Sequence, residues 1–181
     1  MSYQEPTGWI QTYSGKKFFP LNPILEDIVI EDIAHALSMM CRFTGHCKEF
    51  YSVAQHSVLV SMQCSEANQL YGLLHDASEA YITDISRPVK RTRELEGYRV
   101  VEKNLQAAIC KRFGLPEEEP EEVKLADTRL LVTEARDLMS PLHPDWVHPS
   151  EPYEFKIEAV APYMAKRLFL ERFNALTEKK I

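Results

Sequence analysis

The sequence lacks the features that place a protein in or across a membrane. None of its apolar runs approaches the roughly 20 residues that a membrane-spanning helix requires. Its first residues, MSYQEPTGW, contain neither the basic start nor the apolar core of a secretory signal. We therefore expect a cytoplasmic protein that has no membrane partner.

Two kinds of binding motif are also missing. The four cysteines, at positions 41, 47, 64 and 110, form no C-x-x-C pair, so we expect free thiols rather than a zinc ribbon. Neither of the glycine-rich phosphate loops, G-x-x-x-x-G-K-[ST] and G-x-G-x-x-G, is present. The sequence also contains no internal repeat and no low-complexity segment.

The sequence has fewer basic than acidic residues. The chain has 21 Lys and Arg residues against 27 Asp and Glu residues, which gives a net charge of −6 at pH 7. A general nucleic-acid surface would show a basic stripe, so we expect no nucleic-acid duplex as a partner. A small phosphorylated substrate that is held by a few local cations is compatible with this balance.

Hydrophobic periodicity predicts an all-α fold of five to seven helices. The predicted helices span residues 31–41, 51–65, 67–81, 89–113, 121–139 and 154–177, the last bent at Pro162. Residues 9–20 form a plausible small β-hairpin around Ser14-Gly15. With 181 residues, we expect an N-terminal tail, residues 1–8, and one domain, residues 9–181.

Polar residues with metal-binding chemistry gather in the stretch GLLHDASEAYITDISRPVK, residues 72–90. His75 and Asp76 are adjacent, and Glu79 follows one helical turn later, so the three share a helix face. An imidazole nitrogen and carboxylate oxygens are ligands that divalent metals take. The alternative is an ordinary polar pair that caps a helix or faces water.

Two further predicted helices carry a polar residue on their apolar face. His56 and Asp127 each have aliphatic residues three or four positions away on both sides. A carboxylate in such a position is costly unless it is paired or bound to a metal. Packing alone would favour leucine at both positions.

The order His56, His75-Asp76, Asp127 resembles the H…HD…D signature of the HD-domain metal-dependent phosphohydrolases. The run HDASEAYITDISRPVK is similar to the region that follows the HD pair in small nucleotidases of this superfamily. Residues 9–60 resemble the start of short bacterial and phage members, which include phage dATP triphosphohydrolases and 5′-deoxynucleotidases. The resemblance implies that these four residues bind one or two divalent ions of Zn, Mn, Co or Mg.

The implied activity is hydrolysis of deoxynucleoside mono- or triphosphates by attack of a metal-bound water on the α-phosphorus. Glu79 and Asp84 are the predicted catalytic acids, which orient that water or move its proton. Arg42 and Lys90 are predicted to neutralise charge on the phosphate. A cyclic-nucleotide or (p)ppGpp hydrolase, and a non-catalytic nucleotide-binding HD protein, are the alternatives.

Further predictions concern the loop that contains Arg42, the oligomeric state and the surface of one predicted helix. Phe43 and His46, in the loop with Arg42, are predicted to line the substrate site, with Phe43 stacking on the base. The family resemblance leads us to expect a homo-oligomer. The proline-rich loop at residues 140–152 either completes a neighbour's pocket or is a surface connection. Four charged residues of the predicted helix at 121–139 are expected to form surface pairs: Arg129, Glu134, Arg136 and Asp137.

Overall fold

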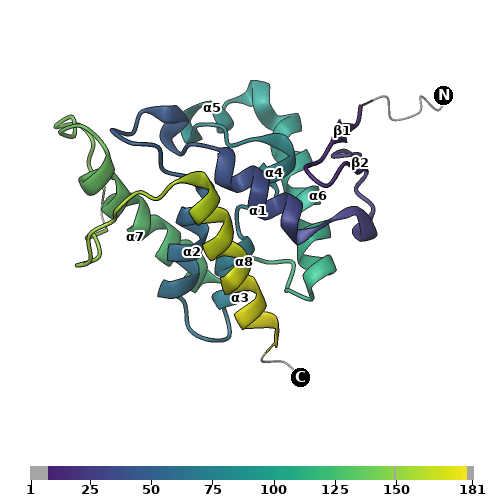
Figure 1. Cartoon of the computed structure of the whole chain (residues 1–181). Helices are drawn as coiled ribbons and strands as arrows, with labels where there is room; N and C mark the ends of the chain where they lie inside the picture. The colour runs from purple at the N-terminus through teal and green to yellow at the C-terminus, as the bar shows by residue number, and fades with distance from the viewer. Residues whose placement is uncertain (1–7, 149, 179–181) are drawn as a thin grey trace.

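A computed structural model describes residues 8–148 and 150–178, and this part of the chain is mainly helical (Figure 1). The helices are α1 (Ile30–Met39), α2 (Val53–Gln63), α3 (Gln69–Leu74), α4 (Glu79–Ile82), α5 (Arg87–Lys90), α6 (Glu96–Phe113), α7 (Glu121–Leu138) and α8 (Pro162–Glu178). Three short 3₁₀ turns are η1 (Leu25–Asp27), η2 (Phe43–Gly45) and η3 (Arg93–Leu95). The all-α prediction is confirmed. Among the described residues, no helix is long and apolar enough to cross a bilayer.

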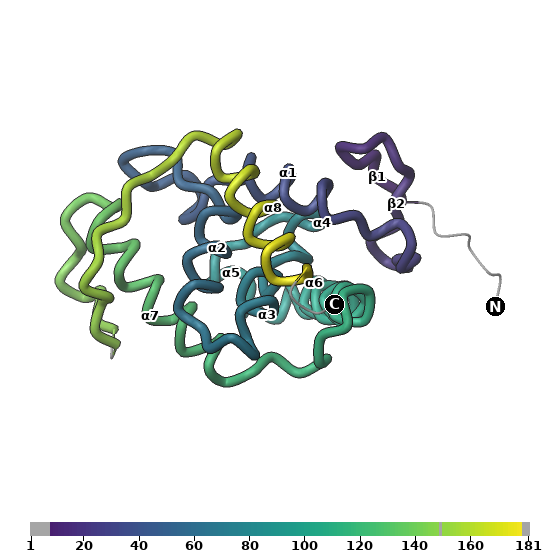
Figure 2. The backbone as a smooth tube through the Cα atoms, turned by 60° about the horizontal axis from the view of Figure 1, so that its bottom comes forward, coloured from purple at the N-terminus to yellow at the C-terminus, as the bar shows by residue number. Residues whose placement is uncertain are grey.

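The predicted hairpin is present. Strand β1 (Ile10–Gln11) pairs antiparallel with β2 (Lys17–Phe18), and Gly15 turns the chain with φ of 84°. The turn is fastened to α1, because the amide and hydroxyl of Ser14 donate hydrogen bonds of 2.6 and 2.9 Å to the carboxylate of Asp32. Figures 1 and 2 place the hairpin and α7 at opposite ends of the molecule.

Helix α2 lies at the centre of the fold, where it packs against α1, α3, α7 and α8 (Figure 2). Most of its residues are buried, and a helix buried on all sides needs few charged residues. One apolar cluster, which includes Ile33, Leu73 and Phe169, packs on the side of α1 and α8. A second, which includes Tyr51 and Leu130, packs on the side of α7. Any polar side chain that points from α2 toward α7 is therefore enclosed.

Helices α2 and α3 approach each other closely at Gly72. A Cβ atom at this position would lie 3.1 Å from both Cys64 Sγ and Ser61 Cα, so only glycine fits without displacement. The Ser61 hydroxyl donates a 2.7 Å hydrogen bond to the carbonyl of Gln69, which fastens the same contact. The close packing brings the end of α3 near the middle of α2.

The predicted helix at 67–81 is wrong in one respect, because residues 75–78 form a turn between α3 and α4. A side chain from α6 stabilises the break. Gln106 donates to the carbonyl of Leu74 at 2.8 Å and accepts from the amide of Ser78 at 3.1 Å. These bonds satisfy backbone groups that a continuous helix would pair internally.

The predicted helix at 89–113 is also divided, into α5, η3 and α6. Arg99 binds the carbonyls of Lys90 and Thr92 at 2.6 and 2.7 Å, so the chain turns between α5 and α6. The C-terminal end of α6 is as predicted, since Gly114 follows it with φ of 68°. These two divisions account for the difference between the six predicted helices and the eight α-helical segments of the described chain.

The last helix begins at Pro162 rather than at residue 154. Residues 153–161 form no helix, and the side chain of Gln55 pairs with them instead, bonding to the carbonyl of Glu158 and the amide of Val160 at 2.8 and 3.0 Å. Proline disfavours helical backbone in the residue before it and suits the first position of a helix. The prediction of a bend at Pro162 is therefore wrong: the helix starts there.

Candidate metal centre

The structure brings His56, His75, Asp76 and Asp127 together from three separate parts of the chain. His56 comes from α2, His75 and Asp76 come from the turn after α3, and Asp127 comes from α7. His56 Nε2 lies 3.3 Å from His75 Nε2, 3.5 Å from Asp76 Oδ2 and 3.2 Å from Asp127 Oδ1. The distance between His75 Nε2 and Asp76 Oδ2 is 3.3 Å.

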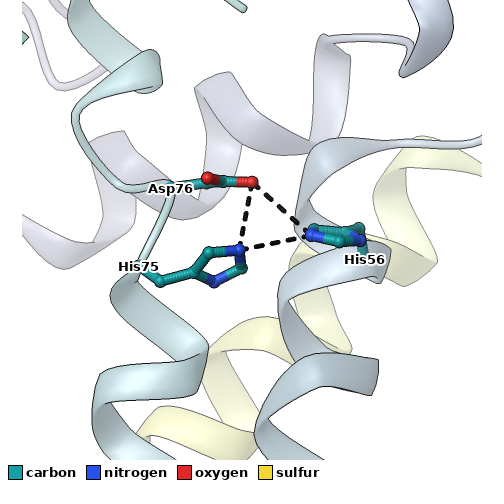
Figure 3. A group of neighbouring side chains, drawn as sticks. All are labelled: His56, His75 and Asp76. Carbon is teal, nitrogen blue, oxygen red and sulfur yellow. Dashed lines mark hydrogen bonds and ion pairs between the residues drawn. The ribbon is translucent and has the colours of Figure 1, made fainter. Parts of the chain in front are cut away.

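This set of donor atoms suits a divalent cation. One donor atom each from His56, His75 and Asp76 lies within 4.8 Å of the other two, and Figure 3 shows the three side chains pointing toward one another. Asp127 Oδ1 adds a second carboxylate beside His56. Two imidazole nitrogens and two carboxylates could hold Zn²⁺, Mn²⁺, Co²⁺ or Fe²⁺.

Both histidines are oriented by a partner on the far side of the ring. His75 Nδ1 lies 2.8 Å from the carbonyl of Gly72, which can only accept a hydrogen bond. His56 Nδ1 lies 2.6 Å from Glu134 Oε1. With Nδ1 donating in each ring, Nε2 is the nitrogen that can ligate a metal.

The prediction of Glu134 as a member of a surface pair is wrong. Its side chain is fully buried, and it accepts hydrogen bonds from Tyr51 Oη at 2.8 Å and Arg42 Nε at 3.2 Å besides facing His56. Burial raises the pKa of a carboxyl, but Arg42 and His56 outweigh burial and hold the pKa of Glu134 below its usual value. Leu130 and Leu138, one turn away on either side, are buried and could have signalled an inward Glu134.

The other three residues of the predicted surface pairs, Arg129, Arg136 and Asp137, agree better with the prediction. Arg136 and Asp137 form the expected pair, with Nε 2.7 Å from Oδ1. Arg129 instead binds the carbonyl of Glu151 at 3.1 Å and lies over the ring of Tyr153. None of these three contacts the four candidate ligands in the described chain.

The ligand groups compensate one another's charge. Burial is the largest influence on the pKa of His75 and lowers it, but Asp76, Asp127 and the carbonyl of Gly72 together raise that pKa to about 10. Burial likewise opposes ionisation of Asp127, yet the hydrogen bond from His56 and the charges of His56 and His75 together lower its pKa to about 2. The pKa of Asp76 is lowered by His75, His56 and Arg42 against the same penalty. A metal ion at this centre would replace protons that the histidines otherwise hold.

Glu79, at the start of α4, is a buried acid beside the candidate ligands. It is 5% exposed, and its Oε2 atom has no hydrogen-bond partner among the described residues. Burial, followed by the charges of Asp76 and Asp84, raises the pKa of Glu79 well above its usual value. A buried carboxyl group with a raised pKa is suited to act as a general acid or base.

Asp84 lies half-buried just after a strained residue. Thr83 has φ of 72° and ψ of 158°, a region that is close to exclusive to glycine. The hydroxyl of Tyr98 donates a 2.6 Å hydrogen bond to the carbonyl of Thr83, and the amide of Thr83 donates to the carbonyl of Glu79 at 2.8 Å. These contacts hold the segment that joins the two predicted catalytic acids.

The two predicted phosphate-binding cations are engaged with acids. Arg42, whose side chain is 12% exposed, lies between Glu134 and Asp76, with Nη1 3.6 Å from Asp76 Oδ2. Lys90 Nζ lies 2.6 Å from Glu102 Oε1 and 3.7 Å from Glu79 Oε1. The charged group of each of these two side chains is therefore paired with acidic side chains.

The predicted substrate wall is a loop with unusual backbone geometry. Phe43 has φ of 54°, and the guanidinium of Arg42 lies 5.8 Å from the centre of its ring. His46 is exposed at the outer side of η2. The substrate-binding roles of Phe43 and His46 stay predictions.

Sequence reasoning did not single out Arg87. Its Nη2 atom lies 3.7 Å from Asp127 Oδ2, and its side chain is 52% exposed. No periodicity marks it, because it lies in the turn of α5 between Ser86 and Pro88.

Comparison with known proteins shows the family to which the chain belongs, but the relatives' names state no activity. No family model matches the sequence. The chain is 43% identical over 173 residues to the uncharacterized protein YfdR of Escherichia coli K12, an alignment that covers 94% of this chain and 96% of YfdR. The chain belongs to the family of YfdR. It is also 39% identical over 127 residues to the uncharacterized protein RCAP_rcc00048 of Rhodobacter capsulatus, which covers 65% of this chain and 64% of that protein.

Proposed function

We propose that this chain is a metal-dependent phosphohydrolase of the HD-domain type that acts on deoxynucleoside phosphates. One observation carries the proposal: His56, His75, Asp76 and Asp127 converge beside the buried carboxyl of Glu79. The HD-domain resemblance of the sequence around these residues supports the same function.

The residues fit a bound divalent ion. Both Nε2 atoms are directed by Nδ1 contacts on the far side of their rings, to Glu134 and to Gly72. The side chains of Asp76 and Asp127 are 23% and 21% exposed, so the centre is reachable from solvent on their side. A divalent ion there would supply Lewis-acid activation of water and of a phosphoryl oxygen.

Glu79 supplies the proton-transfer group. Its raised pKa keeps it protonated closer to neutral pH than an ordinary glutamate, so it can exchange a proton during hydrolysis. A centre that served only to hold the fold together would need its ligands but not an adjoining buried acid with an unpaired oxygen, which costs stability. This difference favours an enzyme over a structural metal site.

The substrate class follows from charge and from the resemblance. Arg42, Arg87 and Lys90 place three cations around the carboxylates in a protein whose net charge is −6. A phosphate group suits such a local cluster, and Phe43 offers an aromatic ring for a base. The deoxyribose preference rests on the resemblance alone. The cytoplasmic location and the homo-oligomer remain expectations from the sequence.

A substrate screen tests the function. Metal-stripped protein is loaded with Mn²⁺, Co²⁺, Zn²⁺ or Mg²⁺ and incubated with the deoxynucleoside mono- and triphosphates, and phosphate and triphosphate release are measured separately. Cyclic nucleotides and (p)ppGpp are included to test the alternatives. The proposal predicts metal-dependent hydrolysis of at least one deoxynucleotide. Formation of a nucleoside monophosphate from a cyclic nucleotide, or release of pyrophosphate from (p)ppGpp, with no deoxynucleotide hydrolysed, would contradict it.

A further inference from the structure

Three cations reach the candidate metal centre, and they differ in what already binds them. Arg42 is nearly enclosed and paired with Glu134 and Asp76. Lys90 is held by a 2.6 Å contact to Glu102. Arg87 is half exposed, and across residues 8–148 and 150–178 its side chain makes a single ion pair, 3.7 Å to Asp127.

The two oxygens of Asp127 face different groups. Oδ1 faces His56 Nε2 at 3.2 Å, on the side where the candidate ligands converge, and Oδ2 faces Arg87 Nη2 at 3.7 Å. An ion held between His56 and Asp127 would neutralise the carboxylate that now attracts Arg87. The guanidinium would then lie one carboxylate away from the ion, with most of its five donors available.

We infer that Arg87 is the residue that binds the phosphate group of the substrate. The inference rests on the proposed hydrolase function. An arginine is suited to this task because its planar fork donates two parallel hydrogen bonds to a phosphate and its charge does not depend on pH in the working range. Arg42 and Lys90 would then act mainly on Asp76, Glu134 and Glu79, where the structure pairs them.

The surrounding chain supports a fixed position for Arg87. Pro88 follows it directly at the start of α5, which restricts the backbone of both residues. The end of the same turn is held by Arg99, which binds the carbonyl of Lys90 at 2.6 Å. A half-exposed ion pair adds little to stability, so loss of the Arg87 side chain should leave the fold intact.

The experiment compares Arg87→Ala and Arg87→Lys with Arg112→Ala. Arg112 is an exposed arginine near the end of α6, about 15 Å along the helix from Glu102, so it controls for the loss of one positive charge. Metal content is measured for each Mn²⁺-loaded variant, and binding of inorganic phosphate is measured by calorimetry on the same samples. The KM for the best nucleotide of the substrate screen is measured in parallel.

We expect Arg87→Ala to keep its metal and to bind phosphate at least tenfold more weakly, the usual scale for losing a charged hydrogen bond. Arg87→Lys should lie between Arg87→Ala and the wild type, because a lysine keeps the charge but loses the fork. Arg112→Ala should match the wild type. Equal phosphate affinity and KM in Arg87→Ala and the wild type would overturn the inference.

The outcome separates this inference from the proposed function. If the wild type binds phosphate through Arg87 but hydrolyses no nucleotide, the proposed function fails and the assignment of Arg87 stands. If the wild type hydrolyses a nucleotide and Arg87→Ala does so with unchanged KM, the function stands and the assignment of Arg87 fails.

Discussion

Glu134 Oε1 lies 2.6 Å from His56 Nδ1, and neither side chain is exposed to solvent. This contact joins α7 to α2 at the centre of the fold. It fixes the His56 ring with Nε2 toward His75, Asp76 and Asp127. Glu134 thus acts on the candidate metal centre without being one of its ligands.

Glu134→Gln tests this role. The amide keeps the size of the side chain but removes the charge that supports His56 and Arg42, so we expect metal affinity to fall by about 10- to 100-fold. Metal affinity is measured by competition with a chelator. Glu121→Gln, an exposed change at the start of the same helix, is the control and should leave the affinity unchanged. Wild-type affinity in Glu134→Gln would show that the contact does not position His56.

Much of the centre could be predicted from the sequence, and Glu134 shows why part of it could not. His56 and Asp127 each interrupt an apolar face, which is a pattern that periodicity reveals. Glu134 occupies the same face of α7 as Leu130, but its charged neighbours Arg136 and Asp137 suggested a solvated surface. Leu130 and Leu138 mark the inward face of α7, but Tyr51 and Arg42, which satisfy the buried carboxylate of Glu134, lie far away in sequence, so the local pattern alone does not separate a buried acid from a solvated one.

Glu79→Gln separates chemistry from binding. The amide resembles the protonated acid that the raised pKa favours, so the variant should fold and retain metal. Turnover should fall by roughly 10²–10⁴, the usual scale for losing a general acid–base group. Metal content, nucleotide affinity and turnover are measured on the same preparation. Wild-type turnover would remove Glu79 from the mechanism and leave Asp84 as the better candidate.

Gly72→Ala tests how helix packing supports the centre. The added methyl group would press on Ser61 and Cys64, so we expect the free energy of unfolding to fall by about 1–3 kcal/mol. Because the carbonyl of Gly72 orients His75, metal affinity should fall as well.

Gly97→Ala is the matched control for Gly72→Ala. A Cβ atom at Gly97, in α6, would meet nothing within 4 Å, so alanine should stabilise the protein by up to about 1 kcal/mol through helix propensity. Denaturant unfolding of both variants measures the two effects. A stabilised Gly72→Ala protein would contradict the close approach of α2 and α3.

The pH dependence of stability should reverse when metal binds. The pKa of His75 is raised from 6.5 to about 10 in the metal-free fold, so its proton stabilises that fold fully below pH 6.5 and progressively less as the pH rises toward 10. A metal ion must displace this proton, so its affinity should increase with pH. Between pH 6.5 and about 8.5, below the usual cysteine pKa, Tm should fall for metal-free protein and rise at fixed metal concentration.

Thermal unfolding with and without metal checks this reversal. His75→Gln has no proton to lose at this position, so its metal-free Tm should depend less on pH than that of the wild type. Parallel pH profiles for the metal-free and metal-loaded wild type would mean that His75 does not exchange a proton for the ion.

The sequence failed to predict the breaks in two helices for a different reason from its failure to predict the burial of Glu134. The run LLHDASEAY contains no proline or glycine, and its periodicity continues through the turn at residues 75–78. The break is stabilised by Gln106 from α6, a contact that only the tertiary structure provides. Helix α5 similarly ends where Arg99 binds its last carbonyl. The first break lies within the candidate site, because His75 and Asp76 are two of its turn residues.

The most direct test of the proposed metal-dependent hydrolysis is a titration of metal-stripped protein with Mn²⁺, in which bound metal and nucleotide hydrolysis are followed together. We predict that hydrolysis rises in proportion to occupied sites in the wild type. Asp76→Ala, which removes a carboxylate 3.3 Å from His75 and 3.5 Å from His56, should keep its helices but bind metal weakly and stay inactive across the titration. Hydrolysis by the stripped wild type in excess chelator, or full activity in Asp76→Ala, would contradict the account.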